Sequence, residues 1–441
     1  MTTVLNDVRT HVHPSTPAEV RIALLGLGNV GCAIAELLRR PALSAVEGLD
    51  TTHRFRLVSA LVRDLDRRRS IDTSQVPITS DCLEAIGSYP DVVVEVLGGL
   101  EPARTLVLQA LTRGVPVVTA NKSLLAHHGD ELFEAAATHR TPLHYEASVL
   151  AGVPFLGTFR HRPLARDIVG IAGIVNGTSN FILSRMLTDR APFREALADA
   201  QRSGYAEPDS SKDIDGDDAV EKLCVLLRHF GDWSVRPADI DQTGIQEIEI
   251  EDLEHASAFG GAIRPVVAAD WADGSLSAFA GPAFVSASNP LARVSGVQNA
   301  VSLETRWSGN LFFSGPGAGP AVTAATVLDD VIEAHLLGKV NGHTARKRPV
   351  RHGSGQALRR TSGHGWFVRL TSADPSHDQD APAVLARLGV RLQRTSPLSN
   401  RDGRRRQWLL THHCTRAHLD AALDVLGARS GCESWAVRAI E

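Results

Sequence analysis

Acidic and basic side chains are concentrated in the stretch 204–223, GYAEPDSSKDIDGDDAVEKL. From about Gly216 the apolar residues follow a helical spacing, so Asp218 and Lys222 are expected on one face of a helix. A carboxylate beside an amine can bind a zwitterionic small molecule and transfer a proton, and Glu207 lies on the loop leading in. The same pattern is also typical of a solvated helix start, because acidic side chains are stabilised near a helix N-terminus.

Length and composition limit the class of protein. The chain has 441 residues, of which 43% are hydrophobic, and a formal net charge of −4. This length predicts two or three domains, and the charge indicates no general attraction to nucleic acid or to anionic membranes. The five cysteines are scattered, which argues against a disulfide framework or a structural zinc site. We expect a cytoplasmic globular protein with a flexible tail over 1–19, because no signal-peptide pattern or ~20-residue apolar span is present.

A dinucleotide-binding fingerprint lies near the start of the chain. Residues 20–25 form an apolar run of strand length, followed by GLGNVG and then a helical stretch. In this GxGxxG pattern Gly26 permits the tight turn and Gly28 lets the backbone approach a pyrophosphate. Gly31 lets helix and strand pack closely, and the helix N-terminus then faces the phosphates.

The strands that follow predict the rest of a nucleotide-binding domain. The strand expected at 55–62 carries Arg63 at its tip, where the ribose-binding acid of such folds usually lies. Arg63 can pair with a 2′-phosphate, which favours NADP, but Asp64 follows directly and NAD remains open. Further strands are expected at 91–97 and 115–119, with a helix between them. This β-α-β alternation predicts an open parallel sheet whose strand ends line the cofactor crevice.

The elements beyond residue 119 predict a second domain. Lys122 follows the preceding strand directly and either points into the crevice or extends to solvent. A helix is expected at 129–138, and small residues at 148–154 mark a domain boundary. The pattern beyond them is typical of an α+β domain with an open sheet covered on one face, and Thr178 is a candidate N-cap. The expected strands are 167–175, 262–269, 276–285, 299–306 and 309–314, and the expected helices are 178–189, 193–203, 216–230 and 250–258.

A third unit is expected at the end of the chain. A second Gly-rich turn, GPGAG at 315–319, precedes a helix from about 321 to 337. Residues 338–365 are basic and Gly-rich without apolar periodicity, which is typical of a linker, and the lack of interleaved aromatic residues argues against nucleic-acid binding. Residues 366–441 then give the order βαββαβ of a ferredoxin-like domain.

Four motifs resemble those of the homoserine dehydrogenases, and the resemblance covers roughly residues 20–337. They are GLGNVG at 26–31, TANKSLLA at 119–126, NGTSNFIL at 176–183 and the charged stretch 204–223. The GPGAG turn adds support, and the C-terminal unit is similar to the ACT domain of many bacterial members. The resemblance implies an α/β protein with a Rossmann-type domain over 20–150 completed by helix 320–337, a catalytic and dimerisation domain over 151–319, and an ACT-like regulatory domain over 366–441.

The resemblance also implies a reaction. This is the reversible reduction of L-aspartate 4-semialdehyde to L-homoserine with NADP or NAD as cofactor, in threonine and methionine biosynthesis. The family places the proton-transferring lysine at Lys222 beside Asp218, and a second lysine at Lys122 between nicotinamide and substrate. The expected substrate-side residues are Glu207, Asp213 and Tyr205. The expected cofactor contacts are Gly26, Gly28, Asn29, Val30, Gly31, Arg63, Gly98, Lys122 and Gly319.

The family further has a monovalent-cation site, commonly sodium, built largely from backbone carbonyls, and it is generally dimeric or a higher homo-oligomer. The matching cation positions are Glu146, Val149, Ala151 and Val153. This chain departs from the family pattern at Leu150 and Ala151, where two glycines are usual. The C-terminal unit also lacks the Pro-Gly-Val-Leu-Ala turn that helps to form the effector site of ACT domains. The resemblance therefore does not carry threonine inhibition over to this chain.

Two other functions remain open from the sequence. A non-catalytic nucleotide-binding regulatory protein can have the same fold, although both lysines and the three acids are retained, which favours the enzyme. A dehydrogenase for a related amino-acid aldehyde is separated less well, because one methylene or hydroxyl changes pocket selectivity only modestly.

Overall fold

The computed structural model describes ten stretches of the chain, which form two compact units. Of the described residues, those within 1–121, 132–145 and 327–346 form one unit, and those within 122–131, 146–326 and 347–441 form the other. The described stretches are 18–39, 53–160, 162, 164–272, 275–337, 350–352, 363–372, 381–401, 404–430 and 432–441. Most of the expected tail over 1–19 and of the expected linker over 338–365 therefore lies outside the described residues.

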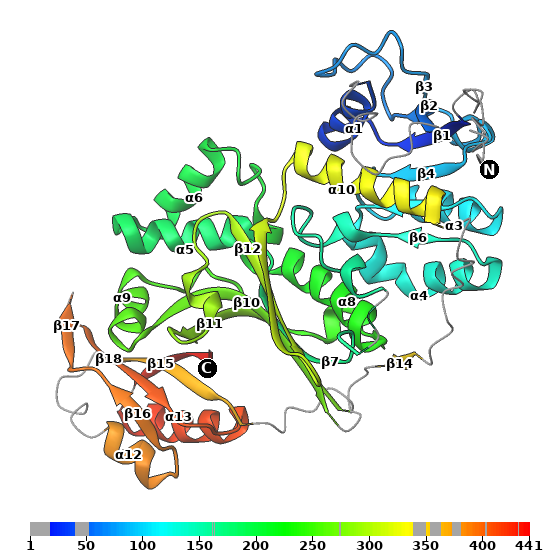
Figure 1. Ribbon diagram of the computed structural model, residues 1–441. Helices are drawn as coiled ribbons and strands as arrows, with labels where there is room; N and C mark the ends of the chain where they lie inside the picture. Colours follow the sequence, from blue (N-terminus) through cyan, green and yellow to red (C-terminus); the bar gives the residue numbers. More distant parts are fainter. Residues whose placement is uncertain are drawn as a thin grey trace, which may run out of the picture. The chain divides into compact units, whose positions relative to one another are not determined.

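A six-stranded parallel sheet forms the first unit (Figure 1). The strand order is β3-β2-β1-β4-β5-β6. From β1 the chain adds β2 and β3 on one side and then returns to add β4, β5 and β6 on the other side of β1. This change of side is the topological switch point of dinucleotide-binding folds. The predicted parallel sheet is therefore confirmed. The strands are β1 (Ala18–Leu25), β2 (His53–Leu61), β3 (Ile78–Thr79), β4 (Val92–Glu95), β5 (Val117–Thr119) and β6 (Leu143–His144), and the helices include α1 (Asn29–Arg39), α2 (Cys82–Gly87) and α3 (Ala103–Thr112).

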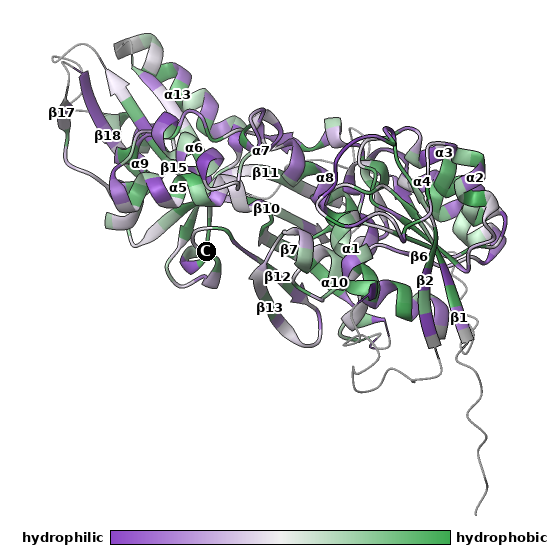
Figure 2. Ribbon diagram, turned by 90° about the horizontal axis from the view of Figure 1, so that it is seen from above, coloured by the Kyte–Doolittle hydropathy of each residue, from purple (hydrophilic) through white to green (hydrophobic). Residues whose placement is uncertain are grey.

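Burial explains why these short segments form strands. All residues of β4 and β5 are buried, as expected for parallel strands that are covered on both faces. The sequence did not predict β3 and α2, because two strand residues and a six-residue helix leave little periodicity. Helix α10 (Pro320–Ile332), which is mostly hydrophobic (Figure 2), is followed by a π-helical turn over Glu333–Leu337, and together they form the helix expected from 321 to 337.

The second unit is built on an eleven-stranded mixed sheet. Helices α5, α8 and α9 pack against β10, in agreement with the predicted α+β pattern. The first strands of this unit are β7 (Ile168–Ile174), β8 (Trp233–Ser234), β9 (Asp241–Gln242), β10 (Gly261–Ala272), β11 (Ser275–Ser286), β12 (Gln298–Thr305), β13 (Gly309–Pro316) and β14 (Arg351–His352). Its helices include α5 (Gly177–Asp189), α6 (Phe193–Arg202), α7 (Ser211–Asp215), α8 (Asp217–Gly231) and α9 (Ile250–Ala258), and short 3₁₀ turns span Glu146–Ser148, Gly157–Phe159, Pro237–Asp239 and Pro290–Arg293.

The C-terminal part has the predicted βαββαβ order with one additional short strand, β17, which pairs with β18. Its strands pair in the order β19-β15-β18-β16, as in a ferredoxin-like sheet. Alternation along β15 places Trp366, Val368 and Leu370 against α12 and α13, whereas Phe367 on the other face packs with α5 and α9. The elements are β15 (Gly365–Ser372), α12 (Ala381–Arg387), β16 (Leu392–Thr395), β17 (Ser399–Arg401), β18 (Arg404–Thr411), α13 (Arg416–Ser430) and β19 (Glu433–Ile440).

This C-terminal sheet continues the sheet that precedes it. Strand β19 pairs in parallel with β11, which joins the two sheets and removes an exposed strand edge. The face that carries Phe367 is further held by an ion pair between Arg369 and Asp252 at 2.5 Å, and Trp408 donates to Asp252 at 2.8 Å. Burial raises the pKa of Asp252 to about 6, although Arg369 opposes it. The sequence did not predict the pairing of β19 with β11, because pairing between distant strand edges leaves no local signal.

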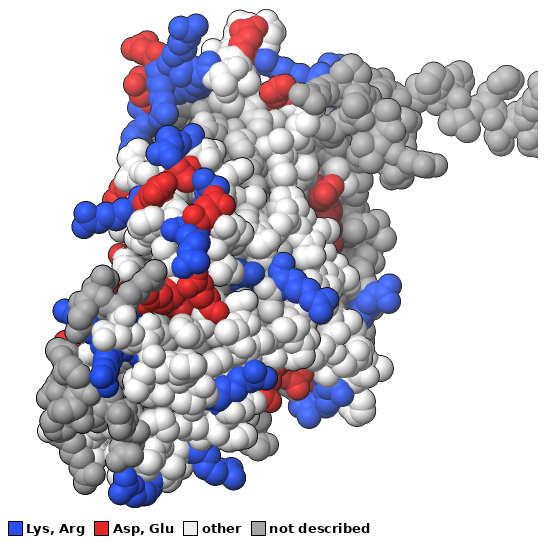
Figure 3. Space-filling view, turned by 90° about the vertical axis from the view of Figure 1, so that its left-hand side faces the viewer, with Lys and Arg blue, Asp and Glu red and all other residues white. Residues whose placement is uncertain are grey.

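The surface offers no single dominant charge on the face drawn in Figure 3, where acidic and basic side chains lie among one another. Such a mixed surface produces no strong field of one sign. Among the described residues, no helix combines the length and the apolar character that crossing a membrane requires.

Candidate active site

The charged stretch folds into α7 and α8, which meet at Gly216. Gly216 has a φ of +97°, a conformation that a residue with a side chain rarely adopts, so it ends α7 and starts α8. Asp218 lies in the first turn of α8 and Lys222 one turn later, as the spacing predicted. Their side chains are only 12% and 13% exposed. The pair is therefore buried, and the alternative of a solvated helix start is wrong for these two residues.

Asp218 lies between two ammonium groups. Its Oδ2 is 2.7 Å from Nζ of Lys222, and its Oδ1 is 3.1 Å from Nζ of Lys122. Lys222 also donates to the backbone carbonyl of Val175 at 2.7 Å. Each carboxylate oxygen thus faces one cation, and the three charges form one compact cluster.

Lys122 reaches this cluster from the first position of α4 (Lys122–His139). The sequence predicted that this helix would begin at residue 129. The helix instead runs through Gly129, since Leu125, Leu132 and Ala136 are all buried at helical spacing. The earlier start is what places the ammonium of Lys122 beside Asp218.

Asn176 is the residue of the cluster that sequence reasoning missed. Its amide nitrogen donates to Asp213 at 2.7 Å and to Asp218 at 2.9 Å, so it ties the two carboxylates together. Its amide oxygen accepts from the backbone N–H of Ser179 and caps α5. The prediction that Thr178 caps this helix is wrong, because α5 begins one residue earlier and the Thr178 hydroxyl donates to the carbonyl of Tyr205. An asparagine directly before a helix was the available signal.

Charge and burial set the protonation states of the two acids. Burial alone would raise the pKa of Asp218, but the two ammonium groups and their hydrogen bonds outweigh burial and hold it well below its ordinary value. Burial raises the pKa of Asp213, against the hydrogen bond from Asn176. Burial would lower the pKa of Lys122, but the attraction of Asp218 outweighs it and the pKa is raised. Asp218 is therefore the anionic centre of the cluster.

Apart from the buried Glu221, the remaining acids of the stretch lie at the surface. Glu207 is exposed on the loop between α6 and α7, and Tyr205 packs on Phe181 with a ring separation of 5.0 Å while 47% of it stays exposed. Asp215 is the last residue of α7 and Asp217 the first of α8. Of the expected substrate-side residues, the structure joins Asp213 to the buried cluster through Asn176.

The glycine turn of the first unit has the geometry that the fingerprint requires. Gly26 has a φ of +109°, and a Cβ there would lie 2.7 Å from the carbonyl oxygen of Val96. A Cβ on Gly31 would lie 2.1 Å from the carbonyl oxygen of Gly26, whereas a Cβ on Gly28 would meet nothing within 4 Å. Asn29 begins α1 and Val30 follows it, half-buried. The space above Gly28 is thus open at the helix N-terminus, where a phosphate would bind.

Arg63 and Asp64 differ in whether their side chains are available to bind the ribose of a nucleotide. Arg63 is exposed two residues beyond the end of β2. The carboxylate of Asp64 accepts backbone N–H bonds from Asp66 at 2.9 Å and Arg67 at 3.2 Å. Asp64 is therefore engaged in shaping its own loop.

The carboxyl ends of β4 and β5 are joined by a buried glutamate, Glu95, which the sequence analysis did not single out. Glu95 closes β4 and is 0% exposed. It accepts from Thr119 at 2.5 Å, from Asn121 at 3.3 Å and from the backbone of Leu97 at 2.8 Å. Burial raises the pKa of Glu95 despite these bonds. The network fixes the loop in which Gly98 adopts a φ of +73°.

The expected cation positions lie in a tight turn after β6. The carboxylate of Glu146 is half-buried and accepts from the backbone N–H groups of Phe155, Leu156 and Gly157 at 2.6–2.8 Å. Val149, Ala151 and Val153 are all buried in the turn that follows. Leu150 has a φ of +54°, so it takes the left-handed conformation for which glycine is usually chosen.

Gly319 lies at the far end of the second Gly-rich turn. It has a φ of +137°, and its carbonyl accepts from the N–H of Thr323 in the first turn of α10. Within the same unit, Gly152 approaches this turn so closely that a Cβ would lie 2.3 Å from the carbonyl oxygen of Pro316.

A dinucleotide-binding sheet and a buried lysine–carboxylate cluster define a nicotinamide-dependent oxidoreductase. Family models described as "Homoserine dehydrogenase, NAD binding domain" and "Homoserine dehydrogenase" match residues 26–146 and 154–332. The chain belongs to the homoserine dehydrogenase family. It catalyses the reversible reduction of L-aspartate 4-semialdehyde to L-homoserine with a nicotinamide cofactor, as the sequence predicted, and the comparisons give no support to either alternative function.

Individual relatives agree with this assignment. The homoserine dehydrogenase of Synechocystis sp. is 39% identical over 325 residues, covering 71% of this chain and 72% of the relative. That of Corynebacterium glutamicum is 33% identical and covers 93% of both chains. A crystal structure of a homoserine dehydrogenase from Thiobacillus denitrificans is similar with a TM-score of 0.84 at 30% identity, over 96% of this chain and 99% of that one. A hyperthermophilic archaeal homoserine dehydrogenase in complex with NADPH is similar over 73% of this chain and 98% of that one, with a TM-score of 0.60 at 28% identity.

Proposed function

We propose that Lys222 transfers the proton that accompanies the reaction, with Asp218 and Lys122 as its partners. The observation that carries this proposal is the buried cluster in which Asp218 contacts Lys222 at 2.7 Å and Lys122 at 3.1 Å. When bound, the nicotinamide cofactor supplies or accepts the hydride. In reduction the ammonium of Lys222 gives a proton to the aldehyde oxygen, and in oxidation the neutral amine takes it back. Lys122, kept charged by Asp218, stabilises the negative charge that develops on that oxygen.

The proposed substrate-binding residues are Asp213, Glu207 and Tyr205. Asp213 shares the amide of Asn176 with Asp218, which supports a position beside a bound substrate ammonium. Glu207 and Tyr205 are exposed on the loop that leads to α7, where they are accessible to an arriving zwitterion. Asn176 adds a donor that orients both carboxylates of the cluster.

The cofactor contacts are proposed at the turn Gly26, Gly28, Asn29, Val30 and Gly31, together with Arg63, Gly98, Lys122 and Gly319. The space above Gly28 is open, whereas Gly31 is densely packed, so a role in phosphate binding can be tested separately from a role in packing. We expect Gly28→Ala to leave the melting temperature nearly unchanged and to weaken cofactor binding, because its methyl group enters the phosphate space. Gly31→Ala should instead lower the melting temperature, because its methyl group collides with the Gly26 carbonyl.

Thermal unfolding and nucleotide titration of both variants separate the two effects. Equal loss of cofactor binding with equal loss of stability in the two variants would contradict the assignment of Gly28 to the phosphate.

NADP is the proposed cofactor, with NAD as the weaker one. Arg63 is exposed at the tip of β2, and the carboxylate of Asp64 is turned to its own loop. The resemblance to a homoserine dehydrogenase in complex with NADPH adds support. We expect Arg63→Ala to raise KM for NADPH by about 10-fold or more, as loss of a charge-assisted hydrogen bond does, and to leave KM for NADH unchanged.

Steady-state kinetics with both nucleotides measures this difference. Arg113→Ala, an exposed arginine of the same unit, serves as the control and should change neither KM. If Arg63→Ala weakened both nucleotides equally, Arg63 would not read the 2′-phosphate.

A monovalent cation such as sodium is proposed at the turn formed by Glu146, Val149, Ala151 and Val153. The ligand groups there are backbone carbonyls and one half-buried carboxylate, which are the hard oxygen ligands that such a cation prefers. The carbonyl of Ala151 also accepts from the hydroxyl of Thr326, which fixes its direction. The donor chemistry of the turn fits the ion, and the resemblance supplies the choice of sodium.

A cytoplasmic homodimer is proposed for the assembly, in keeping with a biosynthetic role. The support within the chain is the edge strand β13, which leads from the exposed Trp307 and carries the exposed Phe312. Exposed large apolar side chains beside an unpaired strand edge are typical of a protein interface.

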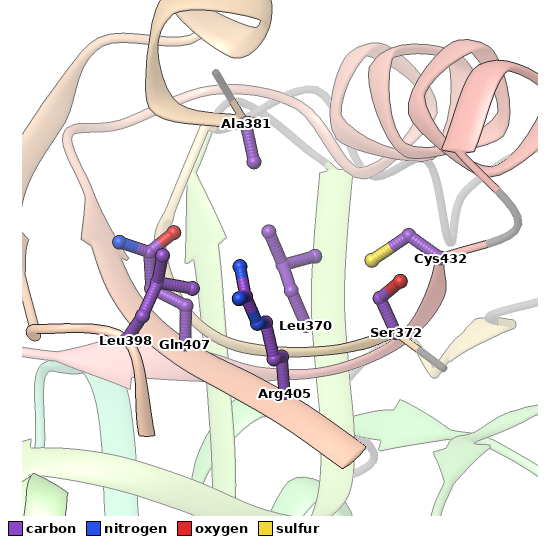
Figure 4. Close-up of a pocket in the computed structure, with 7 residues that line it drawn as sticks. All are labelled: Leu370, Ser372, Ala381, Leu398, Arg405, Gln407 and Cys432. Carbon is purple, nitrogen blue, oxygen red and sulfur yellow. The ribbon is translucent and has the colours of Figure 1, made fainter. Parts of the chain in front are cut away.

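A regulatory role is proposed for the C-terminal part of the second unit, over residues 366–441. It contains a small pocket in which Arg405 lies among apolar and polar side chains from β15, β18 and the ends of neighbouring elements (Figure 4). The similarity of its βαββαβ pattern to that of ACT domains supports this role. The lining residues are Leu370, Ser372, Ala381, Leu398, Arg405, Gln407 and Cys432.

A further inference from the structure

Glu221 is a buried carboxylate of α8 that the proposed chemistry does not use. Its side chain is only 8% exposed. Its Oε2 accepts a hydrogen bond from Oγ of Ser123 at 2.6 Å, and its Oε1 lies 3.7 Å from Nε2 of His127. Both of these partners belong to α4. Because a buried carboxylate is costly without such partners, Glu221 links the two helices.

This link lies directly beside the catalytic contact. Ser123 follows Lys122 in α4, and Glu221 lies three residues after Asp218 on the same face of α8. Neighbouring residues of α4 therefore contact α8 at two points one turn apart, at 3.1 Å and 2.6 Å. Two such contacts fix the position of the first turn of α4 along its helix axis and its rotation about that axis, both relative to α8. His127, one turn later, adds a third point on the same side.

Lys122 needs this support because its own side chain is flexible. A lysine has about 2 kcal/mol of rotamer entropy to lose, and the side chain of Lys122 is 33% exposed. One ion pair at such exposure contributes little by itself. The place of the ammonium therefore depends on where α4 begins relative to α8.

We infer that Ser123 and Glu221 are positioning residues, which hold the start of α4 so that Lys122 stays at Asp218. The inference rests on the proposed role of Lys122 in the reaction. The carboxylates that act on Lys122 are Asp218 and Glu221 of α8 and Asp213 of α7. Burial lowers the pKa of Lys122, and these three charges together outweigh burial and raise it. Glu221 thus affects both the place and the charge of that lysine.

Ser123→Ala, Glu221→Gln and the double variant test this inference in the full-length protein. We expect each single variant to lower kcat by about 10- to 100-fold with little change in KM for the nucleotide, as small misplacements of catalytic groups do. The double variant should be no worse than the poorer single variant, because both changes break the same link. In Glu221→Gln the pH profile of kcat should also shift, since one of the charges acting on Lys122 is removed.

Two further variants make the result decisive. Glu134→Gln, an exposed glutamate of the same helix, should match the wild type, and Lys122→Ala should lose turnover. If Lys122→Ala turned over normally, the proposed role of Lys122 would fail. If Lys122→Ala were inactive while the Ser123 and Glu221 variants kept wild-type kcat and pH profile and only melted earlier, the link would be structural and the inference would be overturned.

Discussion

Replacement of Lys222 by alanine is expected to lower kcat for aspartate semialdehyde reduction by on the order of 10²- to 10⁴-fold, as loss of a general acid does. The side chain of Lys222 is only 13% exposed, contacts Asp218 at 2.7 Å and donates to the Val175 carbonyl, so its ammonium has a fixed direction. Nucleotide affinity should change little, because Lys222 is not among the proposed cofactor contacts. Stopped-flow or steady-state loss of NADPH absorbance measures the effect.

Lys212→Ala is the matched control for this experiment. Lys212 lies in α7, in the same charged stretch, but its side chain is exposed. Its removal should leave kcat within about twofold of the wild type, since isolated exposed charges contribute little. Near-normal turnover in Lys222→Ala, in a protein that binds nucleotide and melts normally, would remove Lys222 from its proposed role.

The second large effect is expected for Asp218→Asn. The substitution keeps the shape of the side chain but leaves Lys122 and Lys222 facing each other without the anion between them. Breaking such a buried pair costs on the order of 3 kcal/mol of stability. The catalytic rate should also fall by at least about 10²-fold, because neither lysine then keeps its position. Urea unfolding and steady-state kinetics measure the two losses, with the exposed Asp217→Asn as control.

The pH dependence of this stability loss has a definite sign. The pKa of Asp218 in the folded protein lies below its ordinary value of 3.8. A group with a lowered pKa contributes stability that is complete above the unfolded value and is lost as the pH falls toward the folded value. The difference between wild type and Asp218→Asn should therefore be constant from pH 8 to about pH 5 and shrink only below about pH 4. A difference that shrinks between pH 8 and pH 5 would contradict the charge assignment.

The parts of the fold that the sequence predicted are those with a local signal. The buried runs of β4 and β5 and the glycine turn before α1 were visible as patterns, and the helical spacing of Asp218 and Lys222 placed both on one face. Asn176 was missed as a site residue because its partner Asp218 is 42 residues away and only the fold brings them together. For the same reason the pairing of β19 with β11 could not be read from either strand.

Leu150 shows a case in which tertiary context overrides local preference. The resemblance to the family implies glycine at this position, where the chain has leucine. Leu150 adopts the left-handed conformation, with φ at +54°, although a leucine in this region costs of order 1 kcal/mol. The buried apolar side chain, which is 2% exposed, contributes a similar or larger amount in return.

The most direct test of the central claim is a steady-state assay of the purified protein with aspartate 4-semialdehyde and each reduced nicotinamide nucleotide. The predicted result is consumption of NADPH, faster than of NADH at equal concentration, with one homoserine formed for each nucleotide oxidised. Absence of turnover with both nucleotides, in folded protein that binds them, would contradict it.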